Sequence, residues 1–345
     1  MKILIIKLSS LGDVIHTLPV ISAIKRFNPD AQITWLVNLA YVPLIRCVKG
    51  VDEVIPFDRE TWRESWKNPK RLFLNFKNLA SLIQQLRRNL FDLVLDLQCL
   101  FRSGFFSWTS ASGQRWGLDN AREFSRLFYT RMIPVKKKHF HAVDQNMEMV
   151  KALFPGKSSY PVSFEWNFSD GIRQSVSRKL EKKGLQGDFC ILAPEARWAT
   201  KQWPYFLELA KLIVEKTRYG VVLIGSKHIL IPSGQKKIVS LSGETSLCEL
   251  AELISRSRFL VSNDSGPMHL AVAAAVPVIA LMGPTRPDKT GPYRNAHVVQ
   301  KKEMPCVPCL KRTCSFKKDP VPCLASITPE EVMKEISYLR VEDSM

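Results

Sequence analysis

Residues 2–19, KILIIKLSSLGDVIHTLP, begin with a short apolar run that ends at a polar loop. The run from Ile3 to Ile6 has no polar alternation, which is typical of a strand buried on both faces of a parallel sheet. The loop from Leu8 to Gly12 follows, and apolar periodicity predicts a helix from Asp13 through Phe27. Strand, loop and helix in this order predict an α/β unit whose sheet is covered on both faces.

The same alternation continues along the chain and restarts after a polar, proline-containing segment at residues 155–169. We therefore expect two α/β halves of similar size, joined near residue 165 and separated by a cleft. Strands are predicted at 32–37, 53–57 and 93–97, then at 190–193, 220–224, 259–262 and 278–282, with helices at 79–89, 203–216, 248–255, 268–275 and 330–339.

Composition sets the broad class of the protein. The 345 residues are enough for about two domains at roughly 150 residues each. Hydrophobic residues make up 46% and charged residues 24%, values that exclude wholesale disorder. The longest uncharged apolar run, Ala271 to Gly283, contains Pro277 and is far shorter than the ~20 residues of a membrane span. The apolar run at the N-terminus stops at Lys7, so no signal peptide is expected.

The positive charge is concentrated in one part of the chain. The formal net charge is +18, and residues 59–138 alone hold 16 basic and 6 acidic residues. Tryptophans such as Trp62, Trp66 and Trp116 are interleaved with these bases. Such a surface attracts the phosphates or carboxylates of a nucleic acid, an anionic membrane or an acidic sugar. A solvated basic face without a dedicated partner is the alternative interpretation.

The first candidate site is the loop after the first strand. In an open α/β sheet, ligands bind beyond the carboxyl ends of the strands. Asp13 is expected at a helix N-terminus, where the helix dipole favours its carboxylate form. Gly12 allows the backbone to approach a ligand closely. The alternative is that Asp13 only caps the helix.

Two further loops follow strands of the second half. Pro267, within Asn263-Asp264-Ser265-Gly266-Pro267-Met268-His269, suits a first helical turn, whose free N–H groups can bind a phosphate. Asp264 and His269 could then bind sugar or phosphate oxygens, or they could be a helix cap and a core histidine. In the other loop, Arg197 and Lys201 could neutralise a diphosphate.

Three familiar nucleotide-binding signatures are absent from the sequence. It contains no G-x-x-x-x-G-K-[ST] and no G-x-G-x-x-G, which argues against a P-loop NTPase and an ordinary dinucleotide oxidoreductase. It also contains no Asp-x-Asp pair, so a divalent metal that holds a nucleotide-sugar diphosphate has no obvious ligands.

Together these segments resemble glycosyltransferase family 9, the ADP-heptose:lipopolysaccharide heptosyltransferases. The resemblance covers nearly the whole chain, in the right order, and it implies the GT-B fold, in which two Rossmann-like α/β domains face each other across a cleft. The segments that carry it are Lys7 to Asp13, Lys201-Gln202-Trp203-Pro204, Asp264 to His269 and Gly283-Pro284-Thr285.

The resemblance assigns a role to each candidate residue. Asp13 matches the family's catalytic base in a metal-independent reaction that inverts the anomeric carbon and needs no cofactor. It implies that the donor-binding residues are Arg197, Lys201, Thr245, Asp264, Ser265, Gly266 and His269. It implies that the acceptor-binding residues are Ser10, Gly12, Arg59, Arg63, Gln98 and Arg122.

Further segments resemble the heptosyltransferase I branch of the family: Thr61 to Trp66, Asp96-Leu97-Gln98, Ala121-Arg122-Glu123, Leu127-Phe128-Tyr129 and His141-Ala142-Val143. That branch moves L-glycero-D-manno-heptose from ADP-heptose to the Kdo of Kdo-lipid A. The expected protein is then a cytoplasmic monomer, peripheral on the inner face of the inner membrane, without a nucleic-acid partner. Heptosyltransferase II or another family member acting on a later core acceptor is the alternative. A more distant alternative is a basic nucleic-acid-binding protein.

The resemblance also implies a different role for each domain. Residues 1–165 would bind the acceptor and carry the base, and residues 166–327 would bind the nucleotide sugar. The terminal helix at 328–345 would pack back on the N-terminal domain. Two departures concern the donor: Ala196-Arg197 stands where a threonine pair is typical, and Ile229 falls near an expected ribose-binding glutamate.

A cysteine cluster near the C-terminus has the spacing Cys306-x2-Cys309-x4-Cys314-x8-Cys323. Four thiols within 18 residues could hold a structural zinc ion tetrahedrally. The spacing differs from the paired CxxC motifs of a strong zinc site, so disulfide or redox pairing and free thiols are the alternatives.

Overall fold

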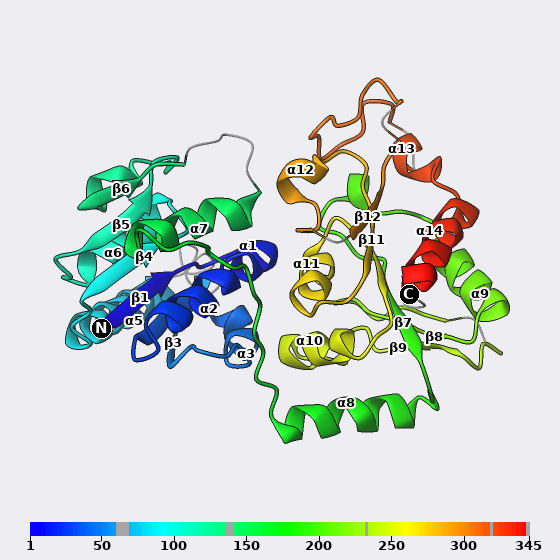
Figure 1. Ribbon diagram of the computed structural model, residues 1–345, viewed down its shortest axis with the longest axis horizontal. Coiled ribbons are helices and arrows are strands. Elements are labelled where there is room, and N and C mark those ends of the chain that lie inside the picture. Colours follow the sequence, from blue (N-terminus) through cyan, green and yellow to red (C-terminus); the bar gives the residue numbers. More distant parts are fainter. Residues whose placement is uncertain are drawn as a thin grey trace. The chain divides into compact units, whose positions relative to one another are not determined.

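The computed structural model describes residues 1–59, 69–135, 141–231, 234–294, 296–301, 303–317 and 320–342. The chain divides into two compact units, Met1–Asn167 and Phe168–Met345 (Figure 1). This division lies two residues beyond the boundary expected at residue 165. Within the described residues, no helix is long and apolar enough to cross a membrane.

The first unit contains a six-stranded parallel sheet in the order β3-β2-β1-β4-β5-β6. Its strands are β1 (Lys2–Ile6), β2 (Gln32–Asn38), β3 (Glu53–Phe57), β4 (Leu93–Asp96), β5 (Arg115–Leu118) and β6 (Arg131–Ile133). Its helices are α1 (Leu11–Ile15), α2 (Leu18–Phe27), η1 (Leu39–Tyr41), α3 (Val42–Ile45), α5 (Pro69–Arg88), α6 (Phe101–Thr109), η2 (Ser125–Phe128) and α7 (Ala142–Leu153).

The second unit repeats this architecture with the order β12-β11-β10-β7-β8-β9. Its strands are β7 (Phe189–Ala193), β8 (Gly220–Leu223), β9 (Ile238–Ser240), β10 (Leu260–Asn263), β11 (Val278–Leu281) and β12 (Ala296–Val299). Its helices are α8 (Asp170–Lys182), η3 (Ala199–Lys201), α9 (Phe206–Lys216), α10 (Leu247–Ser255), α11 (Gly266–Ala273), α12 (Pro287–Thr290), α13 (Pro322–Ala325) and α14 (Pro329–Glu342).

The strands are buried on both faces, as their apolar runs predict. Leu4 and Ile6 pack in one cluster with Leu86 of α5 and Phe106 of α6. Because side chains alternate along a strand, Ile3 and Ile5 face the opposite side of the sheet, and both are fully buried. α2 and α7 pack against each other. The first unit is therefore a three-layered α/β/α structure, as the sequence predicts.

Each sheet changes direction near its middle. In the first unit the chain moves outward from β1 through β2 to β3, then returns to β4 on the other side of β1. In the second unit the same reversal occurs between β7 and β10. Loops diverge at such a point, which leaves a crevice at the carboxyl ends of the two central strands. The loops after β1, β4, β7 and β10 are thus placed to bind ligands.

Three details differ from the sequence-based expectations. The helix predicted at 13–27 is broken into α1 and α2, because Pro19 lies in the first turn of α2 and cannot continue a preceding helix. β5 and β6 were not predicted, because both are short and each begins with an arginine. The helix predicted at 79–89 begins ten residues earlier, at Pro69.

The terminal helix corrects a further expectation. Val332, Ile336 and Leu339 of α14 are buried in the core of the second unit, and α14 packs against α9 and β11. The indole Nε1 of Trp203 donates to the carbonyl of Ile327, 2.9 Å away, just before this helix. α14 therefore packs on the second unit, whereas the sequence-based expectation placed it on the N-terminal half.

Candidate active site

The loop after β1 presents the Asp13 carboxylate at the start of α1. The backbone N and the Oγ of Ser10 donate to Asp13 Oδ2 at 2.9 and 2.7 Å. Asp13 therefore does cap the helix, as the alternative interpretation expected. The cap also fixes the side chain, because both bonds go to one oxygen of a half-buried carboxylate. Gly12 lies inside α1, and its carbonyl accepts from the His16 backbone at 2.9 Å.

Gln98, in the loop after β4, holds this loop in place. Its Oε1 accepts from the backbone N of Leu8 at 3.2 Å and of Ser9 at 3.1 Å. The ammonium of Lys7, buried at the end of β1, donates to the carbonyl of Leu97 at 2.6 Å. The loops after β1 and β4 are thus joined across the crevice. Gln98 was expected to bind the acceptor, and its oxygen here positions the loop that contains Asp13.

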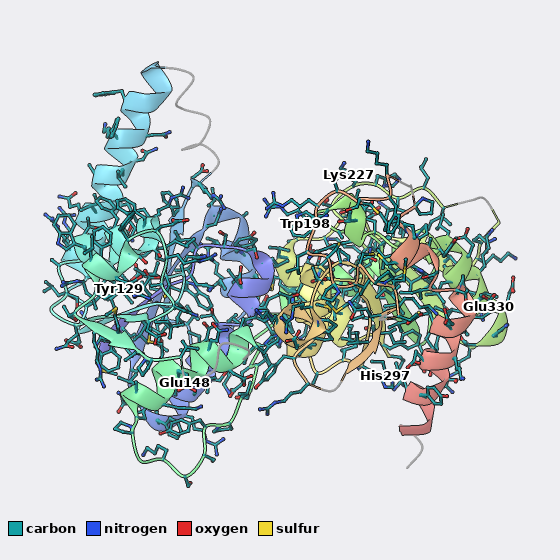
Figure 2. The ribbon with its side chains drawn as sticks, turned by 90° about the horizontal axis from the view of Figure 1, so that it is seen from above. Tyr129, Glu148, Trp198, Lys227, His297 and Glu330 are labelled. Carbon is teal, nitrogen blue, oxygen red and sulfur yellow. The ribbon has the colours of Figure 1, made fainter. Side chains whose placement is uncertain are left out.

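The backbone around Gln98 is in turn organised by Asp96, the last residue of β4. Asp96 is fully buried, and its Oδ1 accepts from the backbone N of Gln98 at 2.9 Å and of Cys99 at 3.0 Å. The Tyr129 hydroxyl donates to Oδ2 at 2.7 Å (Figure 2). Burial raises the pKa of Asp96, although these hydrogen bonds oppose the rise. Burial and the Asp96 charge raise the pKa of Tyr129 as well.

The roles of Asp96 and Tyr129 were not predicted from the sequence, although both residues lie in segments that carry the resemblance. One available signal was Gly117 in β5. A Cβ atom at this position would lie 2.2 Å from the Tyr129 ring, so only glycine leaves room for it. A glycine inside a predicted strand often marks such a close approach, but the missing strand prediction hid it.

Three arginines surround the Asp13 loop. Arg59 donates from Nη1 to the Ser9 hydroxyl at 3.3 Å. Burial, and then the positive charge of Arg59, lower the pKa of Arg102. The backbone N of Arg122 donates to the carbonyl of Cys99 at 3.0 Å, which attaches this exposed arginine to the loop after β4. Arg102 was missed by the sequence analysis, and Arg63 lies outside the described residues.

In the second unit, an ion pair occupies the crevice between β7 and β10. Lys201 Nζ lies 2.7 Å from Asp264 Oδ2, and the two side chains are 16% and 6% exposed. The ammonium also lies 4.6 Å from the centre of the Trp198 ring (Figure 2). Arg197 is fully exposed nearby on the same loop. The two predicted donor-binding residues Lys201 and Asp264 are thus brought into direct contact.

The start of α11 is shaped to receive an anion. Ser265 is its N-cap residue, yet its Oγ lies 3.2 Å from Ser262 Oγ and makes no capping bond to the helix. Gly266 begins the helix, so the first N–H groups of an eight-residue helix lack a side-chain cap. His269 is 7% exposed on the same helix, a location that fits the core-histidine interpretation. Thr245, half-buried, lies just before α10.

The loop after β11 adds an unsatisfied hydroxyl. Thr285 is 6% exposed, and its Oγ1 has no hydrogen-bond partner among the described residues. Gln300 Nε2 donates to the carbonyls of Gly283 at 3.0 Å and Thr285 at 2.9 Å, which fixes this loop. A buried hydroxyl without a partner costs free energy unless a ligand or water satisfies it. Thr285 is therefore a candidate ligand-binding residue, although the sequence analysis gave it no role of its own.

Glu195 is a further residue that the sequence analysis missed. It follows β7, and its carboxylate accepts from Ser226 N and Oγ, both at 2.7 Å, and from Lys227 N at 2.8 Å. Burial raises the pKa of Glu195, but these hydrogen bonds outweigh burial and hold it below its usual range. Ile229, near which a ribose-binding glutamate was expected, packs against the core. Glu195 supplies an acidic group beside Gly225 instead.

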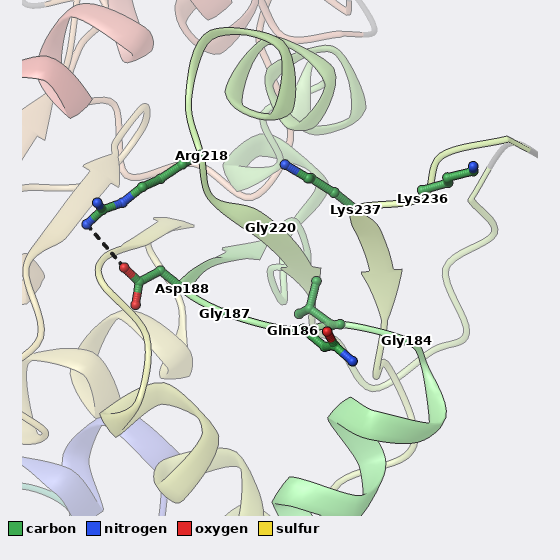
Figure 3. A pocket seen from close by; sticks show the side chains of 9 residues that line it. Gly184, Gln186, Gly187, Asp188, Arg218, Gly220, Lys236 and Lys237 are labelled. Carbon is green, nitrogen blue, oxygen red and sulfur yellow. Dashed lines mark ion pairs between the residues drawn. The ribbon is translucent and has the colours of Figure 1, made fainter.

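A cavity of about 580 Å³ lies at the end of the second sheet that is opposite the carboxyl ends of its strands (Figure 3). Its lining residues precede or begin β7, β8 and β9, and include Arg218, Lys236 and Lys237. Arg218 forms an ion pair with Asp188 at 3.2 Å. Ligands of open α/β sheets bind at the carboxyl ends of the strands, so this cavity is not the expected donor site.

The four clustered cysteines are free and partly buried in the structure. Burial, and then the neighbouring Cys306, Cys309 and Cys314, raise the pKa of Cys323, so the four sulfur atoms share one region. Within the described residues, no group of three or more His, Cys, Asp or Glu side chains is arranged to hold a metal ion. The structure therefore places the four thiols together with no disulfide between them.

Comparison with known proteins identifies the family of this chain. A family model described as glycosyltransferase family 9 (heptosyltransferase) matches residues 79–319. The chain belongs to glycosyltransferase family 9. It is a glycosyltransferase, as the motifs predicted.

Relatives of this family 9 enzyme match it over most of its length. Lipopolysaccharide heptosyltransferase 1 of Pseudomonas aeruginosa is 29% identical, and the match covers 98% of each chain. The structure of E. coli ADP-heptose lps heptosyltransferase II has a TM-score of 0.76 at 24% identity and covers 100% of both chains. E. coli heptosyltransferase WaaC with ADP has a TM-score of 0.76 at 24% identity, over 98% of this chain and 100% of that one. These structures confirm the expected GT-B fold.

The Asp96–Tyr129 bond predicts a pH-dependent stability effect. The pKa of Asp96 in the folded protein lies above its usual 3.8. Below pH 3.8 the contribution of Asp96 to the free energy of unfolding is full. That contribution is lost as the pH rises through the folded-state pKa. The Tyr129→Phe substitution removes a hydrogen-bond donor to the ionised form of Asp96. It therefore raises the pKa of Asp96 further and enlarges the loss of stability. We expect the variant to be destabilised by about 1–3 kcal/mol at pH 7.5 and by less at pH 4.5, measured by urea unfolding.

Tyr160→Phe is the matched control, because the Tyr160 hydroxyl donates to the neutral carbonyl of Phe154 at 2.6 Å. Its cost should be the same at both pH values. If Tyr129→Phe lowered the free energy of unfolding equally at the two pH values, the charge of Asp96 would not depend on this hydroxyl.

Proposed function

We propose that the enzyme transfers L-glycero-D-manno-heptose from ADP-heptose to the Kdo of Kdo-lipid A, the heptosyltransferase I reaction of lipopolysaccharide inner-core synthesis. Membership of family 9 and the full-length likeness to a lipopolysaccharide heptosyltransferase 1 support the reaction class. The observation that carries the proposal is the Asp13 carboxylate, fixed by Ser10 at the carboxyl end of β1 beside Arg59. The enzyme would work at the cytoplasmic face of the inner membrane, as a monomer.

Asp13 supplies the base for this transfer. It takes the proton of the acceptor hydroxyl as that oxygen attacks the anomeric carbon of the heptose, and the bond from this carbon to the ADP oxygen breaks. The sugar is inverted in one displacement, so a single base suffices, unlike the paired carboxylates of a glycosidase. The network from Asp96 through Gln98 keeps the loop and its carboxylate in position before the acceptor arrives.

The second unit stabilises the departing ADP. Charge develops on the diphosphate as the bond breaks, and cationic or N–H donors fixed at that position lower the barrier. Lys201, the first N–H groups of α11 and the Thr285 hydroxyl supply such donors. Lys201 exchanges the Asp264 carboxylate for a phosphate when the donor binds, and Asp264 is then available to accept from a sugar hydroxyl.

The first unit recognises an anionic acceptor. Arg59 contacts the Asp13 loop, Arg102 lies in α6 just after the loop that follows β4, and Arg122 is attached to that loop. Guanidinium groups form paired, charge-assisted bonds with carboxylates and phosphates. The Kdo carboxylates and lipid A phosphates of the proposed acceptor provide both groups. Arg63 belongs to the same proposed set.

Heptosyltransferase II is the second candidate, because the E. coli enzyme of that name matches the fold over the whole of both chains. ADP release from ADP-heptose separates the two, measured in EDTA with Kdo2-lipid A, with its heptosylated product and without acceptor. Release only with Kdo2-lipid A supports the proposal, and release only with the heptosylated acceptor supports the alternative. Release with neither would refute the proposed donor and acceptor pair.

Asp13→Asn should reduce kcat by about 10²–10⁴-fold, because it removes the general base and keeps the shape of the side chain. ADP affinity, measured by calorimetry, should change less than threefold. Asp30→Asn, at an exposed aspartate on a turn, is the control and should leave both quantities unchanged. A large loss of ADP affinity in Asp13→Asn would instead make Asp13 a structural residue.

Lys201→Ala should weaken ADP binding by about 10–100-fold, the range expected for losing a charge-assisted bond. Loss of the ammonium also leaves Asp264 as an unpaired carboxylate beside the diphosphate. Lys211→Ala, on the exposed face of α9, is the control. If calorimetry gave the same ADP affinity for both variants and for the unmodified enzyme, Lys201 would not belong to the donor site.

A further inference from the structure

Two large apolar side chains project into solvent beside the loops that hold Asp13. Phe124 and Leu127 are each 81% exposed, in and just before η2. Phe101 at the start of α6 is 52% exposed, and its ring lies 5.4 Å from that of Phe128. Apolar residues exposed singly are common on protein surfaces, but a cluster of them in one place is not.

The fold separates the apolar residues of this segment into two groups. Gly104 of α6 leaves room for Phe128, since a Cβ at Gly104 would lie 2.6 Å from the Phe128 ring. Ser125 is fully buried, and its hydroxyl donates to the Arg122 carbonyl at 2.7 Å. Phe128 and Ser125 therefore anchor the segment to α6, while Phe124 and Leu127 remain outside.

The backbone of this segment is strained. Glu123 and Phe124 have φ values of +56° and +59°, the left-handed region that L-residues with a Cβ rarely adopt. Two consecutive residues of this kind persist only where the surrounding structure holds them, and such strain gathers at functional sites. Here its consequence is a bulky phenyl ring presented to solvent.

The charges around the apolar residues are mainly positive. Arg102 on α6, Arg126 on η2 and Arg122, three residues before η2, are all exposed. Residues 101–133 hold 5 basic residues (Arg102, Arg115, Arg122, Arg126 and Arg131) against 2 acidic ones (Asp119 and Glu123). Apolar tips flanked by arginines are the features that insert into the interface of an anionic bilayer. A second copy of this chain would place arginine against arginine.

We propose that Phe101, Phe124 and Leu127, flanked by Arg102, Arg122 and Arg126, form a docking surface for an anionic phospholipid bilayer. The inference builds on the proposed function, because a lipid-anchored acceptor has to reach the Asp13 loop from a membrane. The backbone N of Arg122 donates to the carbonyl of Cys99, and Phe101 lies three residues after Gln98, whose Oε1 accepts from the Asp13 loop. Docking here holds the acceptor-binding loops at the bilayer surface.

The test is cosedimentation of the full chain with vesicles of phosphatidylglycerol and phosphatidylcholine, and with phosphatidylcholine alone. We expect binding to the anionic vesicles that weakens with salt. The variant Phe124→Asn/Leu127→Ser should bind them at least tenfold more weakly, and Asn tolerates the left-handed backbone at position 124.

The matched control is Leu90→Asn/Leu230→Ser. Leu90 is 76% exposed with φ +48°, and Leu230 is 79% exposed, so the control removes equal apolar exposure elsewhere. The control should bind vesicles like the unmodified chain. Equal vesicle binding by both double variants, or a dimer that only Phe124→Asn/Leu127→Ser dissolves, would overturn the proposal.

Transfer assays separate this inference from the proposed function. With Kdo-lipid A embedded in anionic vesicles, Phe124→Asn/Leu127→Ser should lose at least tenfold in rate. With a deacylated, water-soluble acceptor it should keep the unmodified rate, because neither residue belongs to the catalytic machinery. Equal losses on both acceptors would contradict the docking role. If the unmodified chain transfers heptose to neither acceptor, the proposed function fails, and vesicle binding still decides the docking surface.

Discussion

The carboxylate of Asp96, buried at the end of β4, takes hydrogen bonds from two backbone N–H groups and one phenol. A charged group in such a place is tolerated only when its bonds are satisfied. Those bonds shape the turn from which Gln98 reaches the loop after β1. Arg122 joins the same turn through the Cys99 carbonyl. The positions of the Asp13 loop and of the Arg122 backbone thus depend on one desolvated carboxylate.

The two units use the same topology with different electrostatics. In the first unit the crevice is closed by hydrogen bonds that no ligand needs to displace, so its loop is preorganised for proton transfer. In the second unit the corresponding crevice contains the Lys201–Asp264 ion pair and the unsatisfied Thr285 hydroxyl. Removing either partner of a buried pair is costly, but exchanging a carboxylate for a phosphate keeps the ammonium paired. The second site is therefore suited to reversible binding of a diphosphate.

Sequence reasoning recovered the central strands, because a buried parallel strand is marked by its own apolar run. It missed β5 and β6, whose short, arginine-containing segments pair at an edge where less apolar surface is buried. It misplaced α14, since an amphipathic pattern shows that one helix face is buried but not which partner covers it. It selected Lys201 and Asp264, which the structure brings into direct contact, and Asp13, which lies in α1 after β1; the roles of all three stay predictions. It did not find Asp96 or Arg102, whose roles come from contacts between segments distant in sequence.

The basic block at residues 59–138 shows why charge counting alone could not locate the site. Some of its arginines serve the fold: Arg87 and Arg115 donate to the backbone carbonyls of Thr109 and Phe128, and Arg131 stacks on Trp116 at 4.4 Å. Arg59 instead donates to the Ser9 hydroxyl beside the Asp13 loop, at 3.3 Å. The total charge of the block therefore does not separate the arginines that serve the fold from those that are available to an anionic ligand.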